Sequence, residues 1–267
     1  MGWGAWPSGP VWKGAGGALA PFARLSLLAE GLPLFRMADY RVDGVSGKVD
    51  RFYEYGQTAF YVEQTDPTKQ VAVPVASALY AGQPAALFTG AEWYTSNRPA
   101  SFFRRWHGAA PGGSTVCVFS PGSFGSTYYI CGTFGGLGPG YGLNWQPATY
   151  VPLVRNTAGA NIIIGSAPGV PARGIYRMQY QEGAPTPEWQ VAGRITPAGT
   201  AVGSGDSTAA PDGGTDPEFT WSLGARSSLG AGAMIGELAM VQLGPYLTAA
   251  QIADQNALLT ALYGALP

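Results

Sequence analysis

The stretch "MIGELAMVQLGPYLTAAQIADQNALLTALYG", from Met234 to Gly264, carries the clearest structural signals in the chain. Its first part has the apolar composition of a β-strand, and a Gly-Pro pair then marks a turn. Thr248 is a natural N-cap, and Gln251 stands three residues later, at the spacing of a capping box. The pattern predicts a helix over residues 249–263 that stops at Gly264 in the left-handed αL conformation.

The whole chain has the composition of an all-β protein. Of its 267 residues, 46% are hydrophobic and only 12% are charged, and it contains 40 glycines and 22 prolines. Glycine and proline at this frequency mark many turns, while the apolar residues suffice for a sizeable core. We therefore expect many short strands joined by tight turns, rather than a helical bundle or a disordered chain.

Short segments with strand patterns recur between turn signals. The segment "EFTWSLGAR" alternates most clearly, with Phe219, Trp221 and Leu223 on one face. A long polar connection precedes it, at residues 196–218. The other segments that we expect to form strands include "AALFTG", "STVCVF", "TYYICGT", "YGLNW", "NIIIG", "GIYRMQY" and "EWQVAGRI".

The charge pattern excludes several classes of protein. The formal net charge is −1 and no basic run is present, so a nucleic-acid-binding surface is not expected. No stretch of 18 apolar residues could span a membrane as a helix. The N-terminal segment "MGWGAWPSGPVWKGAGGALA" lacks a basic n-region and a continuous apolar h-region, so we expect no signal peptide.

The first residues are expected to form an arm. Trp3, Trp6 and Trp12 stand among glycines and prolines with no periodicity that would bury them internally. Large aromatic side chains are enriched at interfaces, so we predict that these three residues contact other subunits or other particles. The alternative is an arm that folds back on its own domain. A short helix, "PFARLSLLAE", follows from Pro21, and we place the boundary between arm (1–32) and domain (33–267) after it.

The two cysteines flank the segment "VFSPGSFGSTYYI". A hairpin centred on this segment would place Cys117 and Cys131 opposite each other. They could then form a disulfide or a redox pair, or remain two reduced and buried thiols. Without a signal peptide, the sequence favours reduced thiols.

Several of these segments resemble the concanavalin A-like, laminin G-like jelly rolls found in bacterial and phage proteins. The resemblance covers roughly residues 33–264 and is most specific in the ending "FTWSLGAR…MIGELAMVQLGPYLTAAQIADQNALLTALYG". The opening segment from "VDGVSGKVDRFYEYG" to "GQPAALFTG" and the segment "STVCVFSPGSFGSTYYICGT" are also similar to that family. The resemblance implies an all-β fold, namely a two-sheet antiparallel jelly-roll sandwich whose C-terminal helix packs at the edge of the sandwich.

The sequence departs from this family at acidic positions. Where the family often has an acidic pair, "FTGAEWYTS" keeps only Glu92, and Met240 stands where a second acid is common in the closing strand. We therefore expect no metal site and no cofactor. The fold that the resemblance implies carries lectins, glycosidases and structural proteins alike, so it does not by itself specify a function.

Catalytic patterns are missing from the sequence. A glycosidase needs two carboxylates that flank the scissile bond, and Glu237 stands alone in "IGELAMVQL". We interpret it as a partly buried carboxylate that holds backbone N–H groups. The single histidine, His107, lies in "RRWHGAAPGGS" outside any triad pattern, and we expect it in a turn. We predict that the protein is not an enzyme.

Aromatic residues near expected loops could stack on sugar rings. The candidates are Trp93, Tyr94, Tyr141 and Trp145. Strands also favour aromatic residues, so the alternative is that about half of these four belong to the core.

Two functional hypotheses follow. The first is a phage virion structural protein, as a capsid-decoration, fibre or tail component, made in the host cytoplasm and assembled with copies of itself and other virion proteins. The arm, the low charge and the missing catalytic set favour it. The second is a lectin-like, carbohydrate-binding module that recognises a cell-surface glycan. Neither hypothesis involves a nucleic acid or a membrane.

Overall fold

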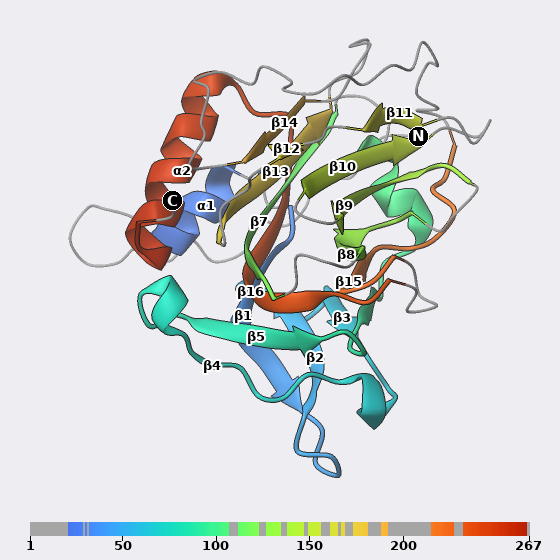
Figure 1. Ribbon diagram of the computed structural model, residues 1–267, viewed down its shortest axis with the longest axis vertical. Coiled ribbons are helices and arrows are strands. Elements are labelled where there is room, and N and C mark those ends of the chain that lie inside the picture. The colour runs from blue at the N-terminus through green and yellow to red at the C-terminus, as the bar shows by residue number, and fades with distance from the viewer. Residues whose placement is uncertain are drawn as a thin grey trace.

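The computed structural model describes residues 21–28, 30, 32–106, 112–122, 127–134, 138–146, 149–155, 161–164, 167–168, 173–180, 188–191, 215–226 and 232–265. Figure 1 shows their helices and strands. The α- and 3₁₀-helices are α1 (Pro21–Leu28), η1 (Pro67–Lys69), η2 (Ala78–Tyr80), η3 (Ala100–Trp106) and α2 (Ala249–Tyr263). The first eight strands are β1 (Leu34–Val42), β2 (Val49–Glu54), β3 (Tyr61–Glu63), β4 (Val75–Ala76), β5 (Pro84–Thr89), β6 (Tyr94–Ser96), β7 (Gly113–Pro121) and β8 (Tyr128–Gly132). The others are β9 (Gly140–Gln146), β10 (Thr149–Arg155), β11 (Asn161–Ile164), β12 (Ala167–Pro168), β13 (Gly174–Tyr180), β14 (Glu188–Val191), β15 (Ser222–Leu223) and β16 (Ile235–Gly244).

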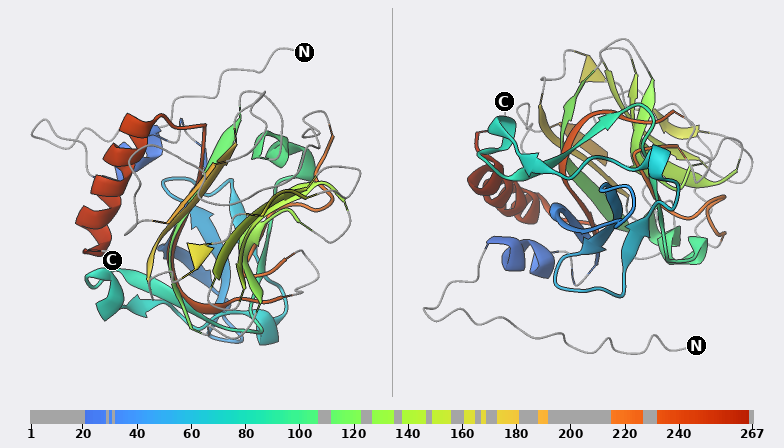
Figure 2. Two further views of the ribbon diagram at one scale, coloured as in Figure 1. Left: turned by 45° about the horizontal axis from the view of Figure 1, so that its top comes forward. Right: turned by 90° about the horizontal axis from the view of Figure 1, so that it is seen from below.

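The strands form one antiparallel hydrogen-bonded path that folds over into two layers. Its order is β11-β10-β9-β8-β15-β6-β3-β2-β1-β16-β7-β13-β14, while β12 pairs with β10, and β5 pairs with β4 and β16. Strands β7, β13 and β16 lie in one layer, and β8, β9 and β10 lie in the other, as the edge-on view in Figure 2 shows. The predicted two-layer, antiparallel all-β sandwich is confirmed.

Aromatic side chains from both layers form the core between them. The ring of Tyr150 on β10 lies 5.0 Å from that of Tyr176 on β13, although these strands stand near opposite ends of the path. Phe119 on β7 likewise contacts Tyr128 on β8, with 6.1 Å between the ring centroids. Because large rings from distant strands meet here, burial of apolar area holds the two layers together.

Strand β7 is buried on both faces. Cys117 and Phe119 point into the core between the layers, whereas Val116 and Val118 belong to a second apolar cluster on the outer face. Helix α2 covers that outer face and contributes Leu259. This arrangement explains why the sequence of β7 is apolar almost throughout instead of alternating.

Helix α2 agrees closely with the sequence-based prediction. The hydroxyl of Thr248 accepts a hydrogen bond from the backbone N–H of Gln251, whose side chain reaches back to the backbone N–H of Thr248. Tyr263 is buried at the C-terminal end of the helix. Gly264 follows with φ 82° and ψ 177°, so the helix stops at the expected glycine, but that glycine is not in the αL conformation.

The expected hairpin pairing of the cysteines is wrong. Cys117 lies on β7 and pairs with strands β13 and β16, whereas Cys131 lies on β8 and pairs with β9 and β15. The chain crosses from one layer to the other between β7 and β8, so the two strands do not form a hairpin. Both thiols are free and fully buried in the core between the layers.

Other expectations differ in outcome. The strand expected around Trp221 is reduced to the short β15, and both Trp221 and Leu223 are fully buried as the alternation predicted. Leu25 of α1 packs into the outer apolar cluster with α2.

None of the described helices is long and apolar enough to cross a membrane. Trp3, Trp6, Trp12, His107 and most of the 196–218 connection lie outside the described residues.

Candidate functional site

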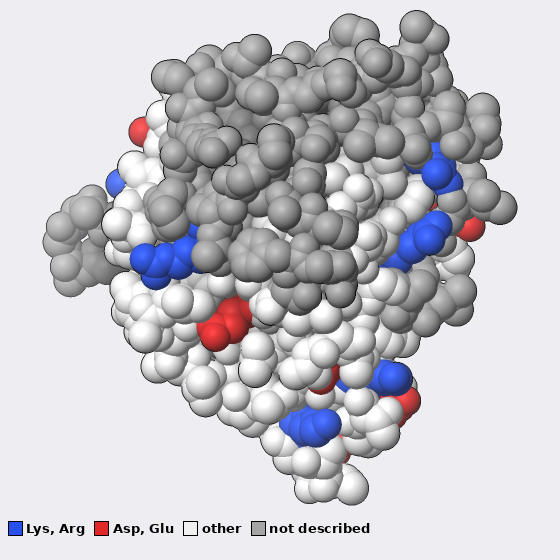
Figure 3. Space-filling view, viewed as in Figure 1, with Lys and Arg blue, Asp and Glu red and all other residues white. Residues whose placement is uncertain are grey.

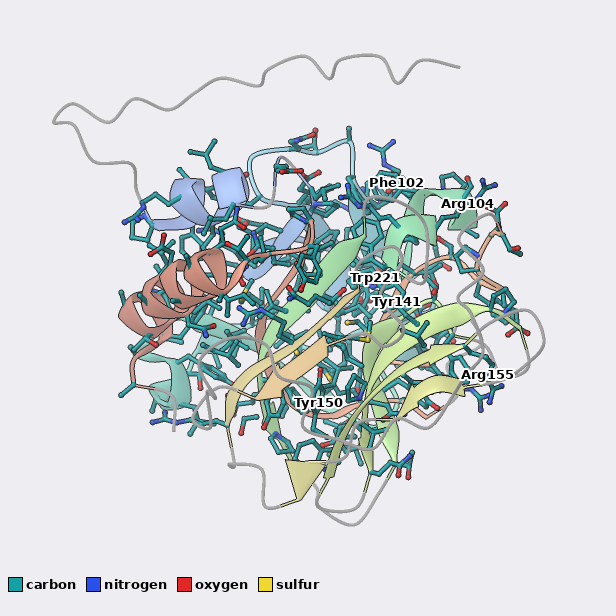
Figure 4. All side chains as sticks on the ribbon, turned by 90° about the horizontal axis from the view of Figure 1, so that it is seen from above. Phe102, Arg104, Tyr141, Tyr150, Arg155 and Trp221 are labelled. Atoms are coloured by element: carbon teal, nitrogen blue, oxygen red, sulfur yellow. The ribbon has the colours of Figure 1, made fainter. Side chains whose placement is uncertain are left out.

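Three of the four predicted sugar-stacking residues are in the core. Tyr94, Tyr141 and Trp145 are fully buried, and Figure 4 shows Tyr141 between the two layers together with Tyr150 and Trp221. These three rings present no exposed face, so the core alternative holds for them and the stacking prediction needs correction. Trp93 is only partly buried and keeps some exposed surface. The structure does not bring Trp93 together with the other three at one surface site.

The acidic residues singled out in the sequence serve local structure. Glu92 accepts hydrogen bonds from the backbone N–H and the hydroxyl of Thr89, both at 2.7 Å, and these bonds lower the pKa of a carboxyl that burial alone would raise. Glu237 is partly buried, and its Oε2 accepts from the hydroxyl of Ser77 at 2.7 Å, where we had expected backbone N–H donors. Across the described residues, no three acidic, histidine or cysteine side chains are grouped to hold a metal ion.

A group of aromatic and arginine side chains lies on the outer face of the layer formed by β8, β9 and β10. We call it the arginine–aromatic cluster; it consists of Tyr129, Phe134, Arg155 and Arg226. The guanidinium carbons of Arg155 and Arg226 lie 4.7 Å and 4.9 Å from the centroid of the Phe134 ring. The ring of Tyr129 is stacked beside Phe134, with 6.0 Å between centroids and 24° between planes. Two cations therefore share one aromatic ring, at the distance at which cation–π attraction is effective.

Strand geometry positions this cluster. Tyr129 lies on β8 next to a register shift against β9, and Arg155 is the last residue of β10, at a register shift against β11. Such bulges change the direction in which a side chain points and are frequent near binding sites. The backbone of Gly232, at φ 61°, passes so close to Tyr129 that an added Cβ would lie 3.0 Å from the ring. A side chain at position 232 would therefore require the Tyr129 ring to shift slightly, and the positive φ at this position favours glycine.

The exposure of the cluster suits a binding surface. Phe134 is 3% exposed and forms the floor, whereas Tyr129, Arg155 and Arg226 are partly exposed above it. Figure 4 shows Arg155 at the outer side of the sandwich. Figure 3 shows charged side chains only scattered over the described part of one face of the molecule, without a large area of one sign. Elsewhere among the described residues one guanidinium group lies over a ring, as Arg36 does over Phe22 and over Tyr55, whereas here two guanidinium groups share the ring of Phe134.

Two other surface features lie elsewhere. The outer side of β4 and β5 exposes apolar residues, with Val75 70% exposed and Leu87 55% exposed. A pocket of about 320 Å³ lies between α1 and α2. Its lining contains two carboxylates, one guanidinium and no aromatic ring, and consists of Arg24, Leu27, Leu28, Glu30, Gln251 and Asp254.

Sequence reasoning missed the arginine–aromatic cluster. Its members come from β8, the segment after β8, the end of β10 and the segment after β15, so no local pattern unites them. The alternation along β8 does place Tyr129 on the face opposite Tyr128, which is the one signal in the sequence that was available.

Comparison with known proteins gives only distant structural likenesses. No family model and no curated protein matches the sequence. A Trypanosoma rangeli sialidase in complex with 2,3-difluorosialic acid is similar over 87% of this chain and 33% of its own, with 14% identity and a TM-score of 0.45. A GH54 α-L-arabinofuranosidase soaked with a cyclic sulfate inhibitor is similar over 82% of this chain and 52% of its own, with 11% identity and a TM-score of 0.47. The receptor-binding domain of a botulinum neurotoxin C/D mosaic serotype is similar over 86% of this chain and 51% of its own, with 6% identity and a TM-score of 0.46.

This chain thus spans between a third and about half of the length of those proteins. Likenesses of this size do not transfer a ligand or an activity to it.

Proposed function

We propose that the protein is a carbohydrate-binding module that binds a glycan through the arginine–aromatic cluster. The observation that carries the proposal is the position of Tyr129, a partly exposed residue whose ring is stacked at 6.0 Å beside the buried Phe134. An aromatic ring that is held by its neighbours can stack on the apolar face of a sugar at little entropic cost. We propose binding without catalysis, because Glu92 and Glu237, the two acidic residues singled out in the sequence, accept local hydrogen bonds from Thr89 and Ser77.

A glycan array with the purified protein tests this proposal. The Tyr129→Ala variant removes the tyrosine ring of the cluster. Tyr61→Ala is a matched control, because Tyr61 is also partly buried and lies 4.3 Å from the guanidinium carbon of Arg51 on β2. We expect the wild type and the Tyr61 variant to bind the same glycans, and Tyr129→Ala to bind them at least about tenfold more weakly.

Two results would overturn the proposal. One is an array on which the folded wild-type protein binds no glycan. The other is undiminished binding by a Tyr129→Ala variant whose melting temperature matches that of the wild type.

A second function, in protein assembly, is favoured by the apolar outer side of β4 and β5. Val75 and Leu87 are well exposed there, and Val73 and Leu79 nearby are each 37% exposed. Exposed apolar groups of this kind are typical of protein contacts. We propose that this face contacts copies of the same chain, and that a virion, assembled in the host cytoplasm, is the setting for this contact.

The oligomeric state tests the assembly proposal. We expect the wild-type protein to sediment as an oligomer and the double variant Val75→Thr/Leu87→Thr to sediment as a monomer, because threonine keeps the β-propensity while it removes apolar surface. A wild-type protein that remains monomeric at all accessible concentrations, or a variant that assembles normally, would exclude this face as the assembly contact.

A further inference from the structure

The arginine–aromatic cluster contains more positive charge than stacking on a sugar requires. The guanidinium carbons of Arg155 and Arg226 both lie within 5 Å of the Phe134 centroid, and that of Arg226 also lies 5.8 Å from the Tyr129 ring. Cation–π contacts engage the flat face of a guanidinium group, whereas its N–H donors lie along the edge of the plane. Two guanidinium groups at one site on the surface offer the kind of N–H donors that bind an anionic group.

Polar atoms without partners lie in the same region. The Nε of Arg226 is buried and has no hydrogen-bond partner. Asn144 is 2% exposed, and its buried Oδ1 also has no partner. On β9, Asn144 is the direct cross-strand neighbour of Tyr129. A buried polar atom without a partner costs free energy, and a sugar can supply both kinds of partner: an acceptor oxygen for the Nε–H of Arg226 and a hydroxyl donor for the Oδ1 of Asn144.

We infer that the ligand is an anionic sugar, a residue that carries a carboxylate or a sulfate group. Its anionic group accepts hydrogen bonds from Arg155 and Arg226, while its ring stacks on Tyr129. Arginine suits this role because its fork of N–H donors matches two oxygens of one anionic group. The inference rests on the proposed carbohydrate-binding function and adds the chemical class of the glycan.

Paired ligands separate this inference from the function on which it rests. The probes are oligosaccharides that contain uronic acids, their carboxyl-reduced forms, sulfated oligosaccharides and their desulfated forms, each titrated calorimetrically into the wild-type protein. We expect the wild-type protein to bind a carboxylated or a sulfated probe, and to bind the neutral form of that probe with an affinity at least about tenfold lower. The carboxylated and sulfated arms identify which anionic group is recognised.

Variants assign the effect to the two arginines. Arg155→Gln and Arg226→Gln should each weaken binding of the anionic probe about tenfold or more, and Arg226→Lys should restore only part of the loss, because lysine keeps the charge without the fork. Arg51→Gln is the matched control, since Arg51 lies over the ring of Tyr61 on other strands. Added salt should weaken binding of the anionic probe.

The outcomes are distinct. Equal binding of anionic and neutral probes, lost in Tyr129→Ala, would overturn the inference and leave the carbohydrate-binding function standing. Binding of the anionic probe that survives both arginine substitutions in folded protein would also overturn it. Absence of binding to every glycan would overturn both proposals.

Discussion

Arg177 on β13 donates a hydrogen bond from Nη2 to Oδ1 of Asn256 on α2, at 3.0 Å. The same nitrogen also donates to the side chain of Gln255. All three side chains are at least 95% buried, so the guanidinium group connects the outer face of the sheet to the helix in a place from which water is excluded. Burial lowers the pKa of Arg177 to about 10. This contact makes the position of α2 specific, in a way that apolar packing alone does not.

Asn256→Ala should destabilise the protein by about 1–3 kcal/mol, because it removes one acceptor from a buried guanidinium group. Asp254→Ala, at an exposed position of the same helix, is the control and should change the free energy of unfolding by less than about 0.5 kcal/mol. Urea denaturation of both variants measures the difference. Equal stabilities would show that the contact between Arg177 and Asn256 contributes nothing.

The stability of the protein should fall as the pH rises from about 4.5 to about 7. Glu54 on β2 is 7% exposed, and burial raises the pKa of its carboxyl from 4.5 to about 7. The positive charge of Arg98 acts in the opposite direction and lowers this pKa, but its effect is smaller. Because the folded state holds the proton more tightly than the unfolded state, the contribution of Glu54 is fully present below pH 4.5 and lost as the pH passes 7. A shift of this size corresponds to about 3 kcal/mol.

Glu54→Gln tests this pH dependence, because glutamine keeps the shape of the side chain and cannot ionise. Melting temperatures of the variant should exceed those of the wild type at about pH 8 and should lack the wild-type decline between about pH 4.5 and pH 7. Glu63→Gln, at a partly exposed position of β3, should leave the decline unchanged. A wild-type protein equally stable at about pH 5 and about pH 8 would contradict the role given to Glu54.

Both cysteines should be unreactive in the native protein. Cys117 and Cys131 are fully buried, so a reagent cannot reach them. Burial also raises the pKa of each thiol, so neither residue forms the reactive thiolate near neutral pH. We expect no alkylation of the folded protein and complete alkylation of both residues after unfolding, measured by mass spectrometry. A stoichiometric disulfide in the unreduced protein would be incompatible with this arrangement and would favour secretion.

Removal of residues 1–20 should abolish assembly and leave the fold intact. The reason is that Trp3, Trp6 and Trp12 can each contribute a few kcal/mol at an interface. The melting temperature of the truncated protein should match that of the intact monomer, and sedimentation should show a loss of oligomers or of particle binding. A truncated protein that unfolds, or one that assembles normally, would show that the arm has no role in assembly.

Local signals explain which parts of the fold could be predicted from the sequence. Thr248 and Gln251 are three residues apart at the start of α2, and Gly264 directly follows its last residue, so each end was predictable from a local signal without knowledge of the partners of α2. The positions of Cys117 and Cys131 relative to each other were not predictable in this way. A pattern centred on residue 124 cannot show that the two consecutive strands β7 and β8 belong to different layers.

The candidate site was even less accessible to sequence reasoning. Strand periodicity separates the two faces of a strand, but it does not show which face is covered when both are apolar. Tyr141 and Trp145 were therefore plausible surface residues and are core residues. Arg226 reaches Phe134 from a segment far along the chain, and only the pairing of β15 with β8 brings the two together. Long-range strand pairing is the information that a single sequence did not provide.

Strand β16 occupies an interior position of its layer and pairs with β1, β5 and β7. Among the described strands it is also the one that the ribosome synthesises last. Until β16 has emerged, β1 and β7 have no common neighbour, and the backbone N–H and C=O groups along the edge of each strand that faces β16 remain unpaired during translation. The layer that α2 covers can close only after every other described strand of the sandwich has been made. Nascent chains of this protein should therefore depend on holding chaperones to a degree that the stability of the finished sandwich would not suggest.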